Sequence, residues 1–99
     1  MNLQELKKIK EQLYQIAAKH GIRKVYVFGS VARGESSPAS DIDLLIEMEA
    51  GASAFGVGAF QYEVQKLLGL RVDVVPTFTL PKVEDKSFVQ SVQAEAVAL

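Results

Sequence analysis

The first twenty residues repeat apolar side chains at steps of three and four, with charged residues between them. This spacing places the apolar side chains on one face of an α-helix and the charged ones mainly on the other. Gly21 is expected to end this helix, because glycine readily takes the left-handed conformation that follows many helices. The apolar positions are Leu3, Leu6, Ile9, Leu13, Ile16 and Ala17.

After this helix the apolar residues gather in three short runs, each bounded by glycine, proline or polar residues. Runs of this length and composition are typical of buried strands. They occupy residues 25–28, 41–48 and 70–75. In the second run Asp41 and Asp43 are two positions apart, so their carboxylates leave the same face of the strand. The opposite face carries Ile42, Leu44, Ile46 and Met48.

Helices are predicted between these strands and after the last one. A short helix is expected over residues 31–34, a longer one from residue 55 to Gly69, and a final one after Pro81. The fold class is therefore α+β, with a small mixed sheet and helices packed on one face. The other face is expected to be a bare polar platform that carries Asp41, Asp43 and Asp73.

The composition narrows the possible functions. A chain of 99 residues is expected to form one domain, residues 1–99, with a modest core. A net charge of −1 without a basic stripe argues against direct nucleic-acid binding, and the lack of cysteine excludes disulfides and zinc–thiolate sites. Since the charged N-terminus does not resemble a signal peptide and no run is long enough to span a membrane, we expect a cytoplasmic protein without membrane association.

The junction between the first strand and the short helix is a candidate anion site. Gly29-Ser30 follows the apolar run and opens the helix. The first amides of a helix have no partner within it, and the helix dipole also favours negative charge at this end. A phosphate group is a suitable ligand for such a helix start.

The paired carboxylates of Asp41 and Asp43 form a candidate metal site. Two carboxylates side by side repel each other, and a hard divalent cation removes that repulsion. Mg²⁺ is usually held by one or two carboxylates together with phosphate oxygens. Together with the candidate phosphate site at Gly29-Ser30, this pattern indicates phosphoryl or nucleotidyl transfer.

These residues resemble the signature of the minimal nucleotidyltransferases, the small branch of the DNA polymerase β-like superfamily. Gly29-Ser30 is followed after ten residues by Asp41-Ile42-Asp43. The resemblance implies a fold like the polymerase β palm, and it covers nearly the whole chain. Three further segments are similar to the family: Ala32–Glu35 with Ser40, Leu67–Gly69 with Arg71–Val75, and Glu95–Leu99.

Asp41 and Asp43 are predicted to hold two divalent cations, which would clamp the attacking and leaving oxygens of an in-line displacement. The resemblance implies that Asp73 is the third carboxylate, which bridges a metal and accepts the proton of the acceptor hydroxyl. The alternative for Asp41 and Asp43 is a pair of exposed strand carboxylates. For Asp73 it is an ion pair with Arg71 or Arg33.

The remaining predicted site residues would bind the nucleotide. Gly29 would allow close approach of the backbone, and Ser30 would offer a hydroxyl and an amide to the β- or γ-phosphate. The alternative for Ser30 is a simple helix N-cap. Arg33 would reach the triphosphate as a bidentate donor, or else pair with Glu35 or Glu47. The resemblance also places the loop 50–58 near the site, although its glycine and alanine content departs from the family.

The resemblance implies an ATP- and Mg²⁺-dependent nucleotidyltransferase that transfers AMP to a hydroxyl and releases pyrophosphate. The implied acceptor is a tyrosine of a partner HEPN ribonuclease toxin, so that the chain acts as the antitoxin of the pair. We expect either a hetero-oligomer with this partner or a homo-oligomer. One alternative is a binding module that neutralises its partner by occlusion. Another is transfer to a small molecule such as an aminoglycoside.

Overall fold

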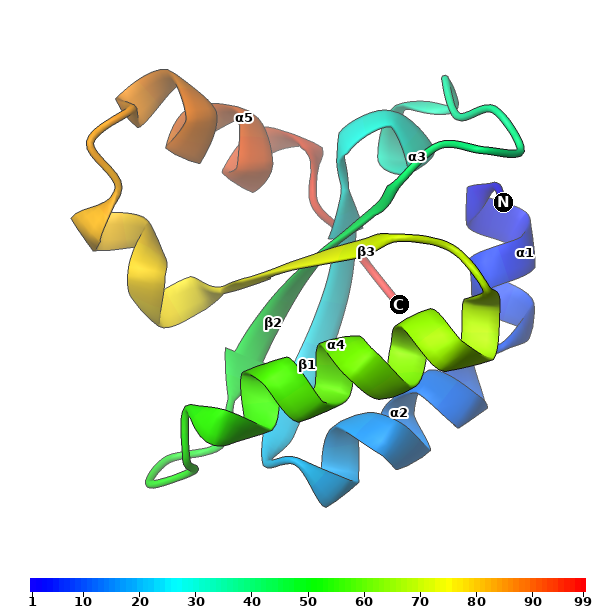
Figure 1. Ribbon diagram of the computed structural model, residues 1–99. Helices are drawn as coiled ribbons and strands as arrows, with labels where there is room; N and C mark the ends of the chain where they lie inside the picture. Colours follow the sequence, from blue (N-terminus) through cyan, green and yellow to red (C-terminus); the bar gives the residue numbers. More distant parts are fainter.

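The computed structural model describes residues 1–99 as a four-stranded sheet with helices (Figure 1). The order of strands across the sheet is β3-β2-β1-β4. Along the chain the elements are α1 (Leu3–Lys8), α2 (Lys10–Lys19), β1 (Ile22–Phe28), α3 (Gly29–Arg33), β2 (Ile42–Met48), α4 (Phe55–Leu68), β3 (Val72–Pro76), the 3-10 helix η1 (Thr77–Lys82), α5 (Lys86–Glu95) and β4 (Val97–Ala98).

The sheet is mixed, as the sequence predicted. β1 runs antiparallel to both β2 and β4, whereas β2 and β3 are parallel. Parallel neighbours need a long crossover connection, and here α4 provides it between β2 and β3. The two-residue strand β4 and the 3-10 helix η1 were not predicted from the sequence.

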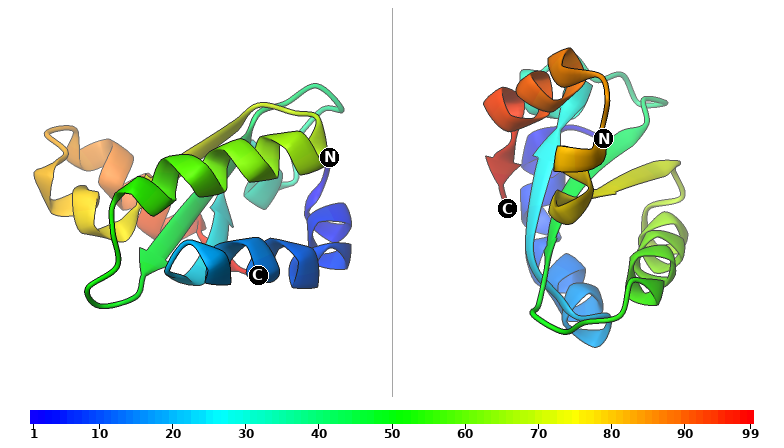
Figure 2. Two further views of the ribbon diagram at one scale, coloured as in Figure 1. Left: turned by 60° about the horizontal axis from the view of Figure 1, so that its bottom comes forward. Right: turned by 90° about the vertical axis from the view of Figure 1, so that its left-hand side faces the viewer.

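The main core lies between one face of the sheet and helices α1, α2 and α4. On that face Val25 and Val27 of β1 are fully buried, as are Ile42, Leu44 and Ile46 of β2. Figures 1 and 2 show α2 and α4 together on this side of the sheet. The helices contribute Leu6, Leu13, Ala17, Phe60 and Val64 to the same cluster. No helix of the structure is long and apolar enough to cross a membrane.

The opposite face is only partly polar, which corrects the predicted bare platform. Phe28 of β1 and Leu45 of β2 form a second buried cluster there with Leu80 of η1 and Val92 of α5. Figure 2 shows η1 and α5 on the other side of the sheet from α2 and α4. Phe28 and Leu45 are apolar side chains that point to this face, and η1 and α5 cover them. The uncovered part of this face, at the end at which β2 begins, carries the carboxylates Asp41, Asp43 and Asp73.

The single N-terminal helix predicted from the apolar spacing is in fact two helices. Ile9 separates α1 from α2 with φ −105° and ψ 17°, and its N–H donates to the carbonyls of Leu6 and Lys7. The spacing was nevertheless informative, because Leu6 from α1 and Leu13 from α2 enter the same core. Gly21 has φ +72° after α2, as the sequence predicted.

β3 is the edge strand next to α4, and two glutamines of that helix bind its backbone. The Gln61 amide donates to the carbonyl of Val72 at 2.8 Å, and the N–H of Val72 donates to Gln65 Oε1 at 3.1 Å. These bonds occupy polar groups that an edge strand would otherwise leave open to another chain. The strand begins two residues later than predicted and includes Pro76, which an edge strand tolerates.

Candidate functional site

The fold brings the three predicted carboxylates together at one end of the sheet. Asp43 of β2 and Asp73 of β3 are direct partners in the parallel register. Asp41 lies two residues before Asp43 and therefore on the same face. The side chains of Asp41 and Asp73 are 48% and 41% exposed, and Asp43 is partly buried. The carboxylates are thus accessible to a ligand from solvent.

Gly29 packs directly against this carboxylate cluster. It is the first residue of α3 and has φ +73°, a conformation that residues with a side chain rarely adopt. A Cβ added at Gly29 would lie 2.4 Å from Oδ2 of Asp43. Its neighbour Phe28 pairs with Asp43 across the sheet, which sets this close approach. Both the backbone angle and the space require glycine here.

Ser30 lies inside the first turn of α3 and does not cap it. The N-cap residue is Phe28, and no side chain caps this helix. The alternative role of Ser30 as a simple N-cap is therefore wrong. Gly34 ends the helix with φ +76°, as the sequence predicted. The amides at the start of α3 point out of the helix beside the carboxylates, while binding of a phosphate by Gly29 and Ser30 stays a prediction.

The environment of Asp43 disfavours its negative charge. Burial raises the pKa of this carboxyl above its ordinary value of 3.8, and the nearby charges of Asp73 and Asp41 raise it further. Arg33 acts in the opposite direction and lowers it. A cation bound at this end of the sheet would relieve the repulsion, because an opposite charge stabilises the ionised form.

Arg71 is the cation that the structure places beside the cluster. Its Nε lies 3.8 Å from Oδ2 of Asp41 and 3.6 Å from Oδ1 of Asp73. The ion pair that the sequence offered as the alternative role of Asp73 is therefore present with Arg71. Sequence reasoning did not include Arg71 among the site residues. Its position two residues before Asp73, and so on the same face of the strand, was the available signal.

Arg33 is engaged by two glutamates. Its Nε donates to Glu35 at 3.1 Å, and its Nη1 donates to both carboxylate oxygens of Glu95 at 3.1 and 3.0 Å. The predicted alternative of a pair with Glu35 is confirmed, whereas Glu47 pairs with Arg23 instead. Glu95 joins α5 to α3 through this contact. A contact of Arg33 with a triphosphate stays a prediction.

The carboxylate oxygens of the cluster suit Mg²⁺, but the side chains do not converge on a single point. Three carboxylates are hard oxygen ligands, and the raised pKa of Asp43 reflects their mutual repulsion. No group of three or more Asp, Glu, His or Cys side chains converges closely enough to hold an ion by itself. These residues therefore fit a cation that completes its coordination with phosphate oxygens and water, as Mg²⁺ commonly does.

The loop 50–58 does not lie where the resemblance placed it. It follows Met48, the last residue of β2, whereas Asp41 and Asp43 lie at the beginning of that strand. A strand of seven residues is about 20 Å long, so its two ends are well separated. Ser53 instead lines a hollow with Lys19 and His20 near the turn between α2 and β1.

Comparison with known proteins identifies the family of this chain. Residues 3–99 match the nucleotidyltransferase domain family. The chain belongs to this family. A relative from Methanocaldococcus jannaschii, named "Putative protein adenylyltransferase MJ0435", is 40% identical over 75 residues, which cover 76% of this chain and 77% of the relative. This nucleotidyltransferase is thus similar in sequence to a protein named for adenylyl transfer.

Solved structures of other proteins have the same fold as this nucleotidyltransferase. One described as a "putative minimal nucleotidyltransferase" is 35% identical, with a TM-score of 0.77 and coverage of 100% of this chain and 97% of that one. Another is described as a tri-AMPylated HEPN toxin of Shewanella oneidensis in complex with its MNT antitoxin. It is 14% identical with a TM-score of 0.62, and the match covers 93% of this chain and 69% of that one. At that identity the likeness concerns the fold alone.

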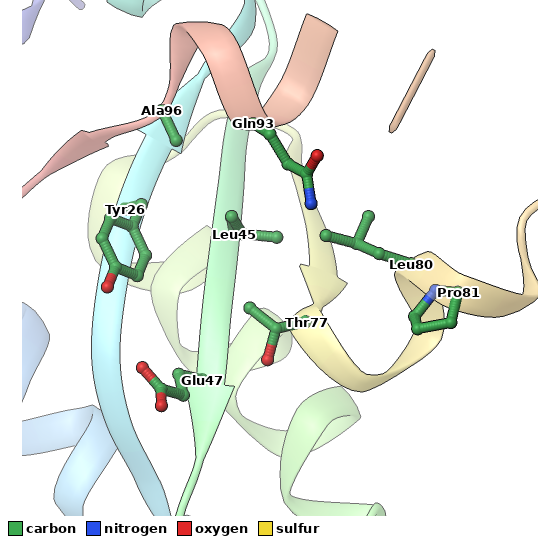
Figure 3. A pocket seen from close by; sticks show the side chains of 8 residues that line it. All are labelled: Tyr26, Leu45, Glu47, Thr77, Leu80, Pro81, Gln93 and Ala96. Atoms are coloured by element: carbon green, nitrogen blue, oxygen red, sulfur yellow. The ribbon is translucent and has the colours of Figure 1, made fainter. Parts of the chain in front are cut away.

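A cavity of about 420 Å³ lies farther along the sheet face that carries Asp43 (Figure 3). Its floor includes Leu45, which follows Asp43 by two positions, and the neighbouring side chain of Tyr26. Figure 3 shows the side chains of η1 on one side of this space and those of α5 above it. The sequence did not predict this cavity, because its walls meet only through the tertiary fold. It is lined by Tyr26, Leu45, Glu47, Thr77, Leu80, Pro81, Gln93 and Ala96.

Proposed function

We propose that this nucleotidyltransferase transfers AMP from ATP to a hydroxyl group in a Mg²⁺-dependent reaction. The main support is that Asp43 pairs with Asp73 in the parallel register and that the backbone of Gly29 lies against Asp43. Carboxylates for a metal and a helix start for a phosphate then lie at the same end of the sheet. This is the arrangement that nucleotidyl transfer needs, since both the attacking and the leaving oxygen must be stabilised.

In the proposed reaction the acceptor oxygen forms a bond to the α-phosphorus of ATP. The bond from that phosphorus to the oxygen bridging the α- and β-phosphates breaks, and pyrophosphate leaves with its electron pair. Asp73 accepts the proton of the acceptor hydroxyl. The start of α3, with Gly29 and Ser30, binds the β- or γ-phosphate, and Arg33 adds positive charge beside it.

Asp41 and Asp43 would hold the Mg²⁺ ions, with Asp73 as a third ligand. Two ions per site are proposed. When bound, Mg²⁺ supplies positive charge that neutralises the triphosphate and the leaving pyrophosphate. Before the reaction their negative charges would attract the Mg²⁺ ions, and the bound ions would in turn attract the phosphates of the nucleotide.

We further propose that the acceptor is a tyrosine of a HEPN toxin and that this protein is the antitoxin of the pair. The name of the Methanocaldococcus jannaschii relative supports transfer of AMP to a protein. The description of the Shewanella oneidensis complex, with an AMPylated toxin, supports the class of partner. Because ATP and Mg²⁺ are both abundant in the cytoplasm, we expect the reaction to take place there.

A second candidate is a binding module that neutralises the partner by occlusion. Large apolar side chains remain exposed on this protein, and a partner would cover them. Phe88 of α5 is 39% exposed although its ring packs edge-on against Phe28, and Phe78 of η1 is 48% exposed. Occlusion of this kind would not need Asp41 and Asp43.

The test is transfer of label from α-labelled ATP to the purified HEPN partner, with Mg²⁺ or with EDTA. We expect label on a partner tyrosine with the wild type and none with Asp41→Ala/Asp43→Ala. A Tyr→Phe change at the labelled site serves as the control on the acceptor. If the wild type silences and binds the partner but transfers no label, adenylylation is ruled out and occlusion is favoured.

A further inference from the structure

Arg71 lies between two carboxylates that the proposed function assigns to the metal. Its Nε is 3.8 Å from Asp41 Oδ2 and 3.6 Å from Asp73 Oδ1. One guanidinium therefore faces Asp41, the residue before β2, and Asp73 of β3, which are distant in the sequence. The backbone supports this placement, because the N–H of Ile42 donates to the carbonyl of Arg71 at 2.9 Å. Arg71 thus lies at the same end of the sheet as the carboxylates it contacts.

A guanidinium and a divalent cation compete for this position. Each would lie within a few ångströms of the same carboxylate oxygens, and like charges at such a distance repel each other. The Arg71 side chain is 71% exposed, so it can turn away into solvent without disturbing the core. The carboxylates themselves are held by β2 and β3 and cannot move apart as easily.

We propose that Arg71 is a built-in counter-ion of the carboxylate cluster, and that a divalent cation binds only by displacing it from between Asp41 and Asp73. This inference rests on the proposed function. It explains how three neighbouring carboxylates are tolerated at one end of the sheet. It also makes the affinity for free metal weaker than the carboxylates alone would give, so that occupancy depends on the phosphate oxygens of the nucleotide.

The test compares Mn²⁺ binding by the full chain and by Arg71→Gln in the absence of nucleotide. Free Mn²⁺ is measured from its electron paramagnetic resonance signal at low ionic strength, where charge effects are least screened. We expect Arg71→Gln to bind Mn²⁺ about three- to tenfold more tightly than the wild type. Arg71→Lys, which keeps the positive charge and therefore its repulsion of the metal ion, should remain within about twofold of the wild type.

Arg23→Gln is the matched control. Arg23 also pairs with a carboxylate, that of Glu47, and its side chain is 57% exposed, so the change removes the same charge from a similar surface ion pair. It lies on β1, away from the residues that Arg71 contacts. We expect Mn²⁺ affinity to stay within about twofold of the wild type in this variant.

Three results would overturn the proposal. One is Mn²⁺ binding by Arg71→Gln that is no tighter than that of the wild type. Another is equal tightening in Arg23→Gln, which would show an effect of net charge alone. The labelled-ATP assay tests the proposed function separately. A wild type that transfers no AMP would contradict that function, and the comparison of Mn²⁺ affinities between the variants would still be valid. Binding that survives Asp41→Asn/Asp73→Asn would also exclude the role assigned to Arg71.

Discussion

The carboxylate of Asp43 occupies the space into which a side chain at Gly29 would point. A Cβ at Gly29 would lie 2.4 Å from Asp43 Oδ2, and the φ of +73° already excludes most other residues. The glycine at the start of α3 therefore allows the backbone amides of this helix to approach the carboxylate cluster. This relationship links the two halves of the signature, Gly29-Ser30 and Asp41-Ile42-Asp43, in space.

Gly29→Ala is expected to lower both stability and activity. The left-handed conformation and the contact with Asp43 together should reduce the free energy of unfolding by about 2 kcal/mol, and AMP transfer should fall at least about tenfold. Thermal unfolding and the labelled-ATP assay measure the two effects. Gly34→Ala is the control, because Gly34 has φ +76° with no atom within 4 Å of the added Cβ. It should lose about 1 kcal/mol and keep its activity; equal loss of activity in both variants would contradict the role of the contact.

Asp43→Asn is expected to stabilise the metal-free protein at neutral pH while it abolishes transfer. The pKa of Asp43 is raised in the folded state, so the folded protein binds the proton more tightly than the unfolded chain. Stability conferred by this group is thus present below the ordinary value of 3.8 and is lost as the pH rises through the higher folded pKa. The side-chain amide introduced by Asp43→Asn cannot ionise, so the variant does not lose this stability as the pH rises. Transfer should fall by about a hundredfold or more, because the charge that binds the metal is gone.

Thermal melts of the wild type and Asp43→Asn in EDTA, from pH 4 to pH 8, measure this difference. The two melting temperatures should lie closest at the acidic end and diverge as the pH rises. Asp85→Asn is a control outside the carboxylate cluster, because Asp85 accepts a hydrogen bond from the N–H of Phe88 at the start of α5 and does not contribute to the raised pKa of Asp43. A wild type that is more stable than Asp43→Asn at pH 7 would contradict the predicted sign.

Arg33→Gln is expected to raise the KM for ATP by about three- to tenfold. Arg33 lies near enough to Asp43 to lower its pKa, so a triphosphate bound beside Asp43 would be within reach of the same charge. Glu95→Gln frees Arg33 from α5 and should leave the KM for ATP unchanged or lower. Steady-state kinetics over a range of ATP concentrations tests both variants. A rise in KM of equal size in both would instead assign Arg33 a purely structural role.

Gln61→Ala/Gln65→Ala is expected to destabilise the protein and to promote association through β3. Each glutamine makes one hydrogen bond to the backbone of Val72, and each bond contributes about 1 kcal/mol. Chemical denaturation and light scattering measure stability and association. Gln12→Ala changes an exposed glutamine on α2 and should have little effect on either. Unchanged stability of the double variant would show that solvent satisfies Val72 equally well.

Much of the site could be predicted from the sequence because its parts are local. Polar and apolar residues alternate around Asp41 and Asp43, and this alternation shows which face of the strand carries the carboxylates. It can be recognised from consecutive residues alone. Gly29-Ser30 follows an apolar run directly, so the start of α3 could also be placed. The pair of Arg33 with Glu35, two residues away, was among the alternatives that the sequence gave. The contact of Arg33 with Glu95 was not predicted, because these residues are 62 positions apart and meet only in the folded chain.

The sequence by itself determined the α+β class, the faces of the strands and the positions of Gly29, Asp41 and Asp43, since periodicity and turn residues act over a few neighbouring positions. Only the tertiary structure decided that Asp73 pairs with Asp43, because the parallel register depends on how α4 returns the chain to the sheet. The contacts of Arg71 follow from that register. The cover of the second face by α5 and η1 was likewise decided by long-range burial of apolar side chains.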